Sequence, residues 1–249
     1  MCMQHHRPLR LAVIRSSVCM ATLNGVRFLR PQIESVLRQL GPTDELIVSD
    51  DGSSDGTLEL LGEYRDSRVR VYRNHFRDVA SNFEFVLGQA RGHTVFLSDQ
   101  DDEWHPRKLE ALQSYLEHCD LAVSDCEVID ADGRTLAPSY FELNRSRPGI
   151  VSNLWRNGYL GCCMAFRTEV LGWALPFPPR VPHDLWIGLV AELGGTTQFV
   201  SDKLVRFRRH EHSTSSAAHQ SRRTLFEKIE TRVRAIAFLI SRRGRIARE

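Results

Sequence analysis

Three aspartates follow an apolar run that has the composition of a buried strand. The run is Val95–Leu97, and the aspartates are Asp99, Asp101 and Asp102. A fold cannot bury several carboxylates without partners, so we expect them to face solvent or a cation. Ligands bind at the C-terminal ends of strands in α/β sheets, and such dense oxygens suit Mg²⁺ or Mn²⁺ with substrate phosphates. The alternative is a solvated acidic turn before a helix that starts at Pro106.

A second acidic segment follows another apolar run. Leu46–Val48 leads into Asp50 and Asp51, within the sequence DDGSSDG. The pattern resembles the start of a calcium loop, but Gly62 stands at the twelfth position, where an EF-hand needs glutamate. A helix N-cap explains part of the segment. Since parallel strands present their C-terminal ends to one crevice, we expect this segment beside the first cluster.

The sequence contains neither G-x-G-x-x-G nor G-x-x-x-x-G-K-[ST]. These motifs mark dinucleotide-binding turns and P-loops, which hold phosphates through backbone amides. Bound phosphates are therefore expected to be held through a metal ion and cationic side chains.

Strand and helix patterns alternate in the first half of the chain, which predicts a parallel sheet covered by helices on both faces. The helix over residues 28–40 contains Pro31, which we expect within its first turn. The expected strands are Val18–Thr22, Leu46–Val48, Val69–Tyr72 and the run at Val95, and the expected helices cover 28–40, 57–64, 79–90 and 106–118.

The second half of the chain has a less regular pattern. After Leu121–Val123, residues 128–134 predict a strand that enters a hairpin turn, and residues 136–149 predict a surface loop. Further expected elements are a strand over Tyr159–Phe166, a proline-rich connector over 176–182, a helix over Asp184–Leu193, and short strands at Thr197–Val200 and Leu204–Phe207.

The C-terminal segment combines an apolar stripe with many arginines. The stripe is Leu225, Ile229, Val233, Ile236 and Ile240, at helical spacing. Such a helix binds a membrane surface, or packs its apolar stripe on the domain or on a partner. Net charge is only +2, so the whole chain does not resemble a nucleic-acid-binding protein.

The six cysteines show no metal-ligand spacing and several lie in apolar runs, which indicates buried thiols in a reducing compartment. The sequence has no run of 18 or more apolar residues, so we expect no transmembrane helix. The N-terminal segment lacks the apolar core and cleavage site of a signal peptide, since Arg15 interrupts it. We therefore expect a cytoplasmic protein, with a position at the inner face of the cytoplasmic membrane left open.

Taken together, these motifs resemble family 2 glycosyltransferases of the A-type fold, in the bacterial branch related to rhamnosyltransferases. The resemblance covers roughly residues 18–213. The matching pieces are Met20–Gly25, Val48–Thr57, Ser98–Trp104, Gly161-Cys162, His183–Trp186 and Phe207–His210. It implies a nucleotide-binding central sheet of parallel type flanked by helices, a less regular acceptor-side half and a C-terminal amphipathic helix. The implied domains are a glycosyltransferase domain over 11–213 and a basic helical tail over 214–249.

The resemblance also implies a set of site residues. Thr22 and Asp51 would line the base pocket, and Asp99 and Asp101 would form the D-x-D pair. Asp101 would bind the metal directly, and Asp99 would contact the ribose or reach the metal through water. The implied nucleotide-sugar residues are Ala21, Thr22, Asn24, Asp50, Asp51, Asp99, Asp102 and Arg208, and the implied ligands of Mg²⁺ or Mn²⁺ are Asp101, Asp99 and His210.

Asp184 matches the family's general base, which removes the proton of the acceptor hydroxyl. The alternative for Asp184 is an N-cap of the following helix. The implied acceptor-side residues are Trp104, Gly161, Cys162, His183 and Trp186. Either tryptophan could stack on a sugar ring or belong to the core.

The expected activity is inverting, metal-dependent transfer from a dTDP- or UDP-linked sugar, rhamnose or a hexose, to a glycan or lipid-linked glycan acceptor. O-antigen, capsule and exopolysaccharide are such acceptors. Ser81, Glu103 and Leu185 depart from the family pattern, which leaves open a weakened or inactive homologue that acts as a membrane-associated scaffold. A nucleotidyltransferase is a further alternative, although the glycine-rich phosphate loop of that class is missing.

Overall fold

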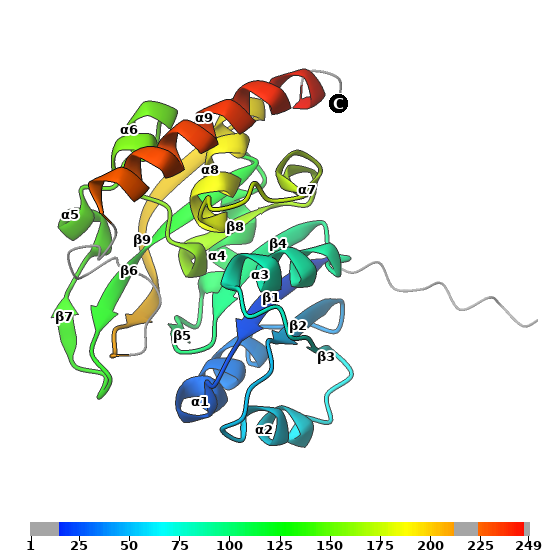
Figure 1. Ribbon diagram of the computed structural model, residues 1–249. Coiled ribbons are helices and arrows are strands. Elements are labelled where there is room, and N and C mark those ends of the chain that lie inside the picture. Colours follow the sequence, from blue (N-terminus) through cyan, green and yellow to red (C-terminus); the bar gives the residue numbers. More distant parts are fainter. Residues whose placement is uncertain (1–14, 212–223, 247–249) are drawn as a thin grey trace, which may run out of the picture.

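The computed structural model describes residues 15–211 and 224–246 (Figure 1). The expected domain limits at residue 11, between 213 and 214, and at 249 lie outside the described residues. So does the N-terminal segment considered above as a signal peptide.

The first half forms the expected parallel sheet. Its strands run in the spatial order β3-β2-β1-β4, and the pairs β1–β2, β1–β4 and β2–β3 are parallel. The predicted strands and helices are confirmed here, with bounds that differ by a few residues. The elements are β1 (Ser16–Thr22), α1 (Val26–Leu37), β2 (Asp44–Asp50), α2 (Thr57–Glu63), β3 (Val69–Arg73), α3 (Val79–Gly88) and β4 (Thr94–Asp99).

Helix α1 differs from the expectation at its start. It begins at Val26, so Pro31 lies inside the helix and not in its first turn. A proline there removes one backbone hydrogen bond. The helix is nevertheless held on the sheet, because Leu29, Ile33 and Val36 are fully buried.

The second half extends the same sheet with strands of both directions. Strand β8 pairs antiparallel with β4 and β6, while β9 runs parallel to β6 and antiparallel to β5. The elements are β5 (Glu103–Trp104), α4 (Lys108–Tyr115), β6 (Leu121–Ile129), β7 (Thr135–Ala137), α5 (Tyr140–Asn144), α6 (Ile150–Trp155), the 3₁₀ helix η1 (Gly161–Cys163), β8 (Met164–Arg167), α7 (Glu169–Ala174), α8 (His183–Gly194), β9 (Thr197–Arg208) and α9 (Leu225–Ile246).

Several expectations for this half were wrong in detail. The two short strands expected after residue 197 form one strand, β9, whose pairing with β6 shifts register around Asp125. The expected loop over 136–149 contains α5, which Ser139 caps by accepting a hydrogen bond from the Glu142 amide. The strand expected over Tyr159–Phe166 is replaced in its first part by η1. The hairpin after β6 is confirmed by its pairing with β7.

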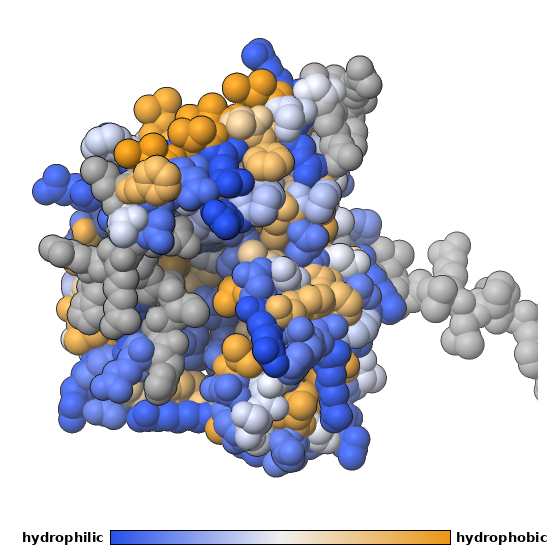
Figure 2. All heavy atoms as spheres, in the orientation of Figure 1, coloured by the Kyte–Doolittle hydropathy of each residue, from blue (hydrophilic) through white to orange (hydrophobic). Residues whose placement is uncertain are grey.

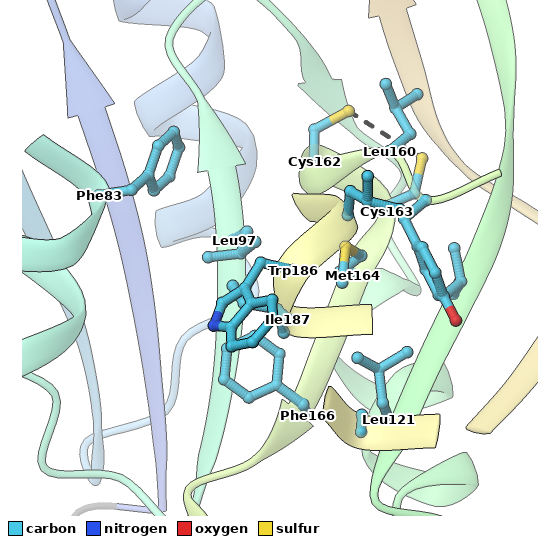
Figure 3. Close-up of a cluster of buried hydrophobic side chains, with 14 of the residues drawn as sticks. Phe83, Leu97, Leu121, Leu160, Cys162, Cys163, Met164, Phe166, Trp186 and Ile187 are labelled. Atoms are coloured by element: carbon cyan, nitrogen blue, oxygen red, sulfur yellow. Dashed lines mark hydrogen bonds between the residues drawn. The ribbon is translucent and has the colours of Figure 1, made fainter. Parts of the chain in front are cut away.

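Alternate residues of the strands feed two apolar clusters, as the two-residue period of a strand requires. In β1, Cys19 belongs to one cluster, and Val18 and Met20 belong to the other. Figure 3 shows part of the first cluster, in which Trp186 of α8 packs beside Phe166 of β8. The sheet and its helices therefore form one body that holds the strand ends in place.

Helix α9 packs on the face of α8 that points away from the sheet (Figure 1). Its Ala235 and Leu239 are buried, and Phe238 meets Trp186 edge-on with ring centroids 6.4 Å apart. Within the described residues, no helix has the length and apolar character that a membrane-crossing segment needs.

Candidate active site

The C-terminal ends of β1, β2 and β4 lie at one edge of the sheet. Thr22 is opposite Asp50 in the β1–β2 pair, and Ala21 is opposite Asp99 in the β1–β4 pair. The two acidic segments are therefore neighbours, as the parallel pattern predicts. Figure 2 shows the surface hollowed between the part that carries these strands and the part that carries α8 and α9.

Asp50 holds the loop that follows β2. Its side chain is fully buried and accepts hydrogen bonds from the Thr22 hydroxyl at 3.0 Å, from the amides of Gly52 and Ser53, and from the Ser53 hydroxyl. Asp50 therefore acts through the shape of the loop.

Asp51 is also occupied within the protein. Its carboxylate is 4% exposed and accepts hydrogen bonds from the backbone amides of Phe76, Arg77 and Asp78. It thus connects the loop after β2 to the start of α3. A direct contact between Asp51 and a nucleotide base stays a prediction.

The loop after β1 is clamped to the loop after β4 by Gln100. The Gln100 side chain accepts a hydrogen bond from the Leu23 amide at 2.9 Å and donates one to the Leu23 carbonyl at 3.0 Å. A Cβ atom at Gly25 would collide with this position of the Gln100 side chain, so the clamp as it stands needs glycine there. On the other side, Asn24 bonds to Ser53 and to the Ser54 amide. The sequence pattern gave no indication of Gln100.

Asp99, Asp102 and the Cys162 thiol gather after β4, with their ligand atoms all within 4.8 Å of one another. Burial, with the charges of Asp101 and Asp184 next in effect, raises the pKa of Asp99 to about 7. Burial, followed by repulsion from Asp101, raises the pKa of Asp102 well above its usual range. The fold therefore concentrates negative charge that a cation would relieve.

The donor set at this edge fits a divalent cation. One oxygen of Asp102 accepts the Arg208 amide, and the other is buried without a hydrogen-bonding partner among the described residues. Asp101 forms a hydrogen bond with Nε2 of His210 at 2.7 Å, so His210, two residues after the end of β9, reaches the acidic cluster. Carboxylate oxygens are the protein ligands that Mg²⁺ and Mn²⁺ prefer. The ligand set Asp101, Asp99 and His210 that the resemblance implies stays a prediction.

Asp184 lies in the first turn of α8, close to this cluster. The helix N-cap is Pro182, so the alternative that Asp184 is the N-cap was wrong. The Asn157 side chain donates a hydrogen bond to Asp184 at 3.3 Å. A Cβ at Gly161 would lie 3.4 Å from the His183 ring and 3.9 Å from Cβ of Asp184. Gly161, His183 and Asp184 are thus brought together; Asn157 was missed by the sequence pattern.

The model of the family described as glycosyl transferase family 2 matches residues 17–172, more than half of the chain. The chain belongs to glycosyltransferase family 2. It is 27% identical to UDP-Glc:alpha-D-GlcNAc-diphosphoundecaprenol beta-1,3-glucosyltransferase WfgD of Escherichia coli over 184 residues, which cover 71% of this chain and 70% of WfgD.

Two solved structures share the fold. TarS of S. aureus in complex with UDP-GlcNAc superposes with a TM-score of 0.69 at 19% identity, covering 94% of this chain and 71% of that one. Glucosyl-3-phosphoglycerate synthase from Mycobacterium tuberculosis, in complex with Mn²⁺, UDP and phosphoglyceric acid, has a TM-score of 0.58 at 24% identity and covers 92% and 78%. These matches confirm the A-type fold. The rhamnosyltransferase-like branch stays a prediction.

Within this family 2 glycosyltransferase, the Arg208 side chain is occupied inside the protein, and the contact with the nucleotide-sugar that the resemblance implies for it stays a prediction. The side chain is buried, and its guanidinium donates to the carbonyls of Asp101, Asp130 and Ala131 and to the Glu103 carboxylate at 2.7 Å. Arg208 fixes the loop that carries Asp101. Glu103, the departure from the family pattern, supplies its ionic partner.

For Trp104, the core alternative holds and the sugar-stacking alternative was wrong. It is 4% exposed and belongs to the core, so it cannot stack on an acceptor sugar. Nζ of Lys108 lies 3.8 Å from the centre of its ring and donates to the Cys162 carbonyl at 2.5 Å. Burial lowers the pKa of Lys108 to about 8. No sequence pattern predicted this buried lysine near the acidic cluster.

Trp186 and Cys162 are equally unable to contact an acceptor directly. Both side chains are fully buried, and Figure 3 shows them in the core. The indole of Trp186 donates to the Ala174 carbonyl at 2.8 Å, which satisfies its one polar group. Gly161 is buried as well. His183 is half-buried, and its ring stacks on Phe83 with centroids 4.2 Å apart. An acceptor-side role for His183 stays a prediction.

Proposed function

We propose that this chain is an inverting, metal-dependent glycosyltransferase that moves a sugar from a nucleoside diphosphate to a glycan or lipid-linked glycan acceptor. The supporting observation is that Asp184 lies beside Gly161, where a Cβ would be 3.9 Å from its own Cβ, and that the next residue, Cys162, places its thiol within 4.8 Å of oxygens of Asp99 and Asp102. One acidic group for the acceptor and several for a cation are the parts that such a transfer needs.

The roles follow from position. Asp101, Asp99 and His210 would hold a divalent cation, which would supply charge neutralisation for the departing diphosphate. Asp184 accepts the proton of the acceptor hydroxyl as its oxygen attacks the anomeric carbon from the face opposite the diphosphate, which inverts that centre. Asn157 holds the Asp184 carboxylate in orientation by its hydrogen bond. Asp50 and Gln100 hold the loops that would carry Thr22, Asn24 and Asp51 to the nucleotide.

The donor that the relatives favour is linked to uridine diphosphate. TarS was solved with UDP-GlcNAc, the Mycobacterium tuberculosis synthase with UDP and Mn²⁺, and WfgD is named for UDP-Glc. We therefore place a UDP-linked hexose ahead of dTDP-rhamnose. WfgD is also named for a diphosphoundecaprenol-linked sugar, which supports a lipid-linked acceptor here.

The proposed compartment is the cytoplasm. The five cysteines of the described residues are free and buried, as is usual for proteins of a reducing compartment.

Two variants separate the proposed roles. Asp184→Asn keeps the shape of the side chain and removes the base, so we expect turnover to fall about 10²- to 10⁴-fold while UDP with Mn²⁺ still raises the melting temperature. Asp101→Asn removes a cation ligand, so we expect both turnover and the Mn²⁺-dependent shift to be lost. Glu34→Gln on the exposed side of α1 is the control and should change neither.

An Asp184→Asn variant with unchanged turnover would exclude the proposed mechanism. A wild-type chain whose melting temperature no nucleoside diphosphate shifts, with or without Mn²⁺, would instead support the scaffold alternative.

A further inference from the structure

Helix α9 has apolar residues on two faces, and only one of them is used within the described fold. Ala235, Phe238 and Leu239 face α8. On the other side lies a stripe that we call the α9 outer face. It consists of Phe226, Ile229, Val233, Ile236 and Ile240, all exposed, with Phe226 at 75% and Ile240 at 71%. A folded chain rarely leaves so continuous an apolar surface without a partner.

The neighbouring helix α6 extends this surface. Val151 and Trp155 are 81% and 77% exposed. Arg232 of α9 connects the two helices, because its guanidinium donates to the carbonyls of Leu154 and Trp155 at 2.7 Å and lies 5.3 Å from the centre of the Trp155 ring. Figure 2 shows the apolar residues gathered along the upper edge of the molecule, over α9 and α6.

The charge of α9 identifies the partner. Residues 225–246 contain six basic and two acidic residues, and the acidic Glu230 is already paired with Arg234 and Arg180. Arg243 is exposed near the C-terminal end of the helix. An apolar stripe with an excess of arginine matches an interface of acyl chains and anionic headgroups. A second copy would bring two positively charged surfaces together.

We propose that the α9 outer face and the exposed end of α6 dock on a lipid bilayer that carries anionic headgroups. Helix α9 would lie in the plane of the interface with its outer face among the acyl chains. The aromatic ring of Trp155 would sit at headgroup depth, where indoles are favoured.

The position of α6 gives this docking a consequence for the site. The chain passes from the exposed Trp155 to Asn157 within two residues, and Asn157 bonds to Asp184. The surface that meets the bilayer is thus directly connected to the carboxylate on the acceptor side. A docked chain would present Asp184 to an acceptor held at the membrane.

Vesicle co-sedimentation of the full chain tests the docking without donor, metal or acceptor, so its outcome is independent of the proposed transfer reaction. We expect binding to vesicles of phosphatidylcholine mixed with phosphatidylglycerol, and weaker binding to phosphatidylcholine alone. Val233→Ser/Ile240→Ser should lower the partition coefficient at least about tenfold. Arg243→Gln should lower it about fivefold on the anionic vesicles.

The controls remove similar groups elsewhere on the surface. Val71→Ser/Leu136→Ser changes two exposed apolar residues of β3 and β7, and Arg38→Gln changes an exposed arginine at the C-cap of α1. Both should bind as the wild type does. Because every changed side chain is solvent-exposed or at an edge, the melting temperatures should stay within a few degrees, which separates lost binding from unfolding.

Three results would overturn the docking proposal. The wild type could fail to sediment with either vesicle, or the α9 and control variants could lose binding equally. Alternatively, sedimentation velocity without lipid could show a dimer that Val233→Ser/Ile240→Ser dissociates, in which case a second copy covers the α9 outer face.

Discussion

Charged side chains near the carboxylate cluster fall into two groups. Asp50, Asp51 and Arg208 are buried with their polar atoms bonded inside the protein, so they set the shape of the loops. Asp99 has a pKa raised by burial and by its acidic neighbours, and the free oxygen of Asp102 is also buried. The carboxyl groups of Asp99 and Asp102 destabilise a fold without a ligand, and strained carboxyl groups of this kind are typical of positions that bind one.

This division gives different predictions for two arginines that share one partner. Arg208 and Arg206 both pair with Glu103, but the Arg208 side chain is 6% exposed and that of Arg206 is 41% exposed. We expect Arg208→Gln to lower the free energy of unfolding by about 2–4 kcal/mol, because buried carbonyls and a carboxylate lose their donor. Arg206→Gln should cost less than about 1 kcal/mol. Urea denaturation measures both.

The contrary result has a clear meaning. If Arg208→Gln left the urea midpoint unchanged and raised only the KM for the donor, Arg208 would be a diphosphate ligand and the structural role assigned to it would be wrong.

At the scale of the elements, α8 packs closely on Tyr159 at Gly188, a contact that intrinsic helix propensity does not take into account. A Cβ at Gly188 would collide with the ring of Tyr159, whose hydroxyl donates to Glu192 at 2.7 Å. We expect Gly188→Ala to destabilise the protein by about 1–3 kcal/mol through overpacking, although alanine favours a helix. Gly62→Ala in α2 has open space and should stabilise by about 0.5–1 kcal/mol. Thermal denaturation should give shifts of opposite sign, and shifts of equal sign would contradict the argument.

Sequence patterns predicted the helices and strands whose local hydrophobic pattern matches their position in the folded protein. The strands that end at Asp50 and Asp99 are apolar runs in a parallel sheet. The two aspartates lie near each other because parallel strands bring these ends to the same edge of the sheet. Helix α6 and the register shift around Asp125 depend instead on packing and pairing with distant segments, so no local pattern revealed them. The same holds in the site, because the partners of Arg208 and of Lys108 lie 50 or more residues away in the chain.

At the scale of the whole molecule, one sheet carries both parts of the site. The strands from β3 to β4 are parallel, and the direction changes between β4 and β8. The acidic loop leaves β4 at this change of direction, where open α/β sheets bind their ligands. Helix α8 packs on the second half of the same sheet, so the Asp184 carboxylate and the Asp99–Asp102 cluster are fixed relative to one another.

This arrangement predicts strong coupling between metal and nucleotide. The site has three aspartates after β4, and Arg208 is occupied inside the protein, so a diphosphate that enters without a cation meets repelling charge. We expect titration calorimetry to show that Mn²⁺ tightens UDP binding at least about tenfold. By linkage, UDP must tighten Mn²⁺ binding by the same factor. Asp102→Asn, which removes one of the carboxyl groups, should reduce both factors together. UDP that binds equally well with and without Mn²⁺ would mean that the nucleotide is held by other groups, and that the cluster after β4 serves another ligand.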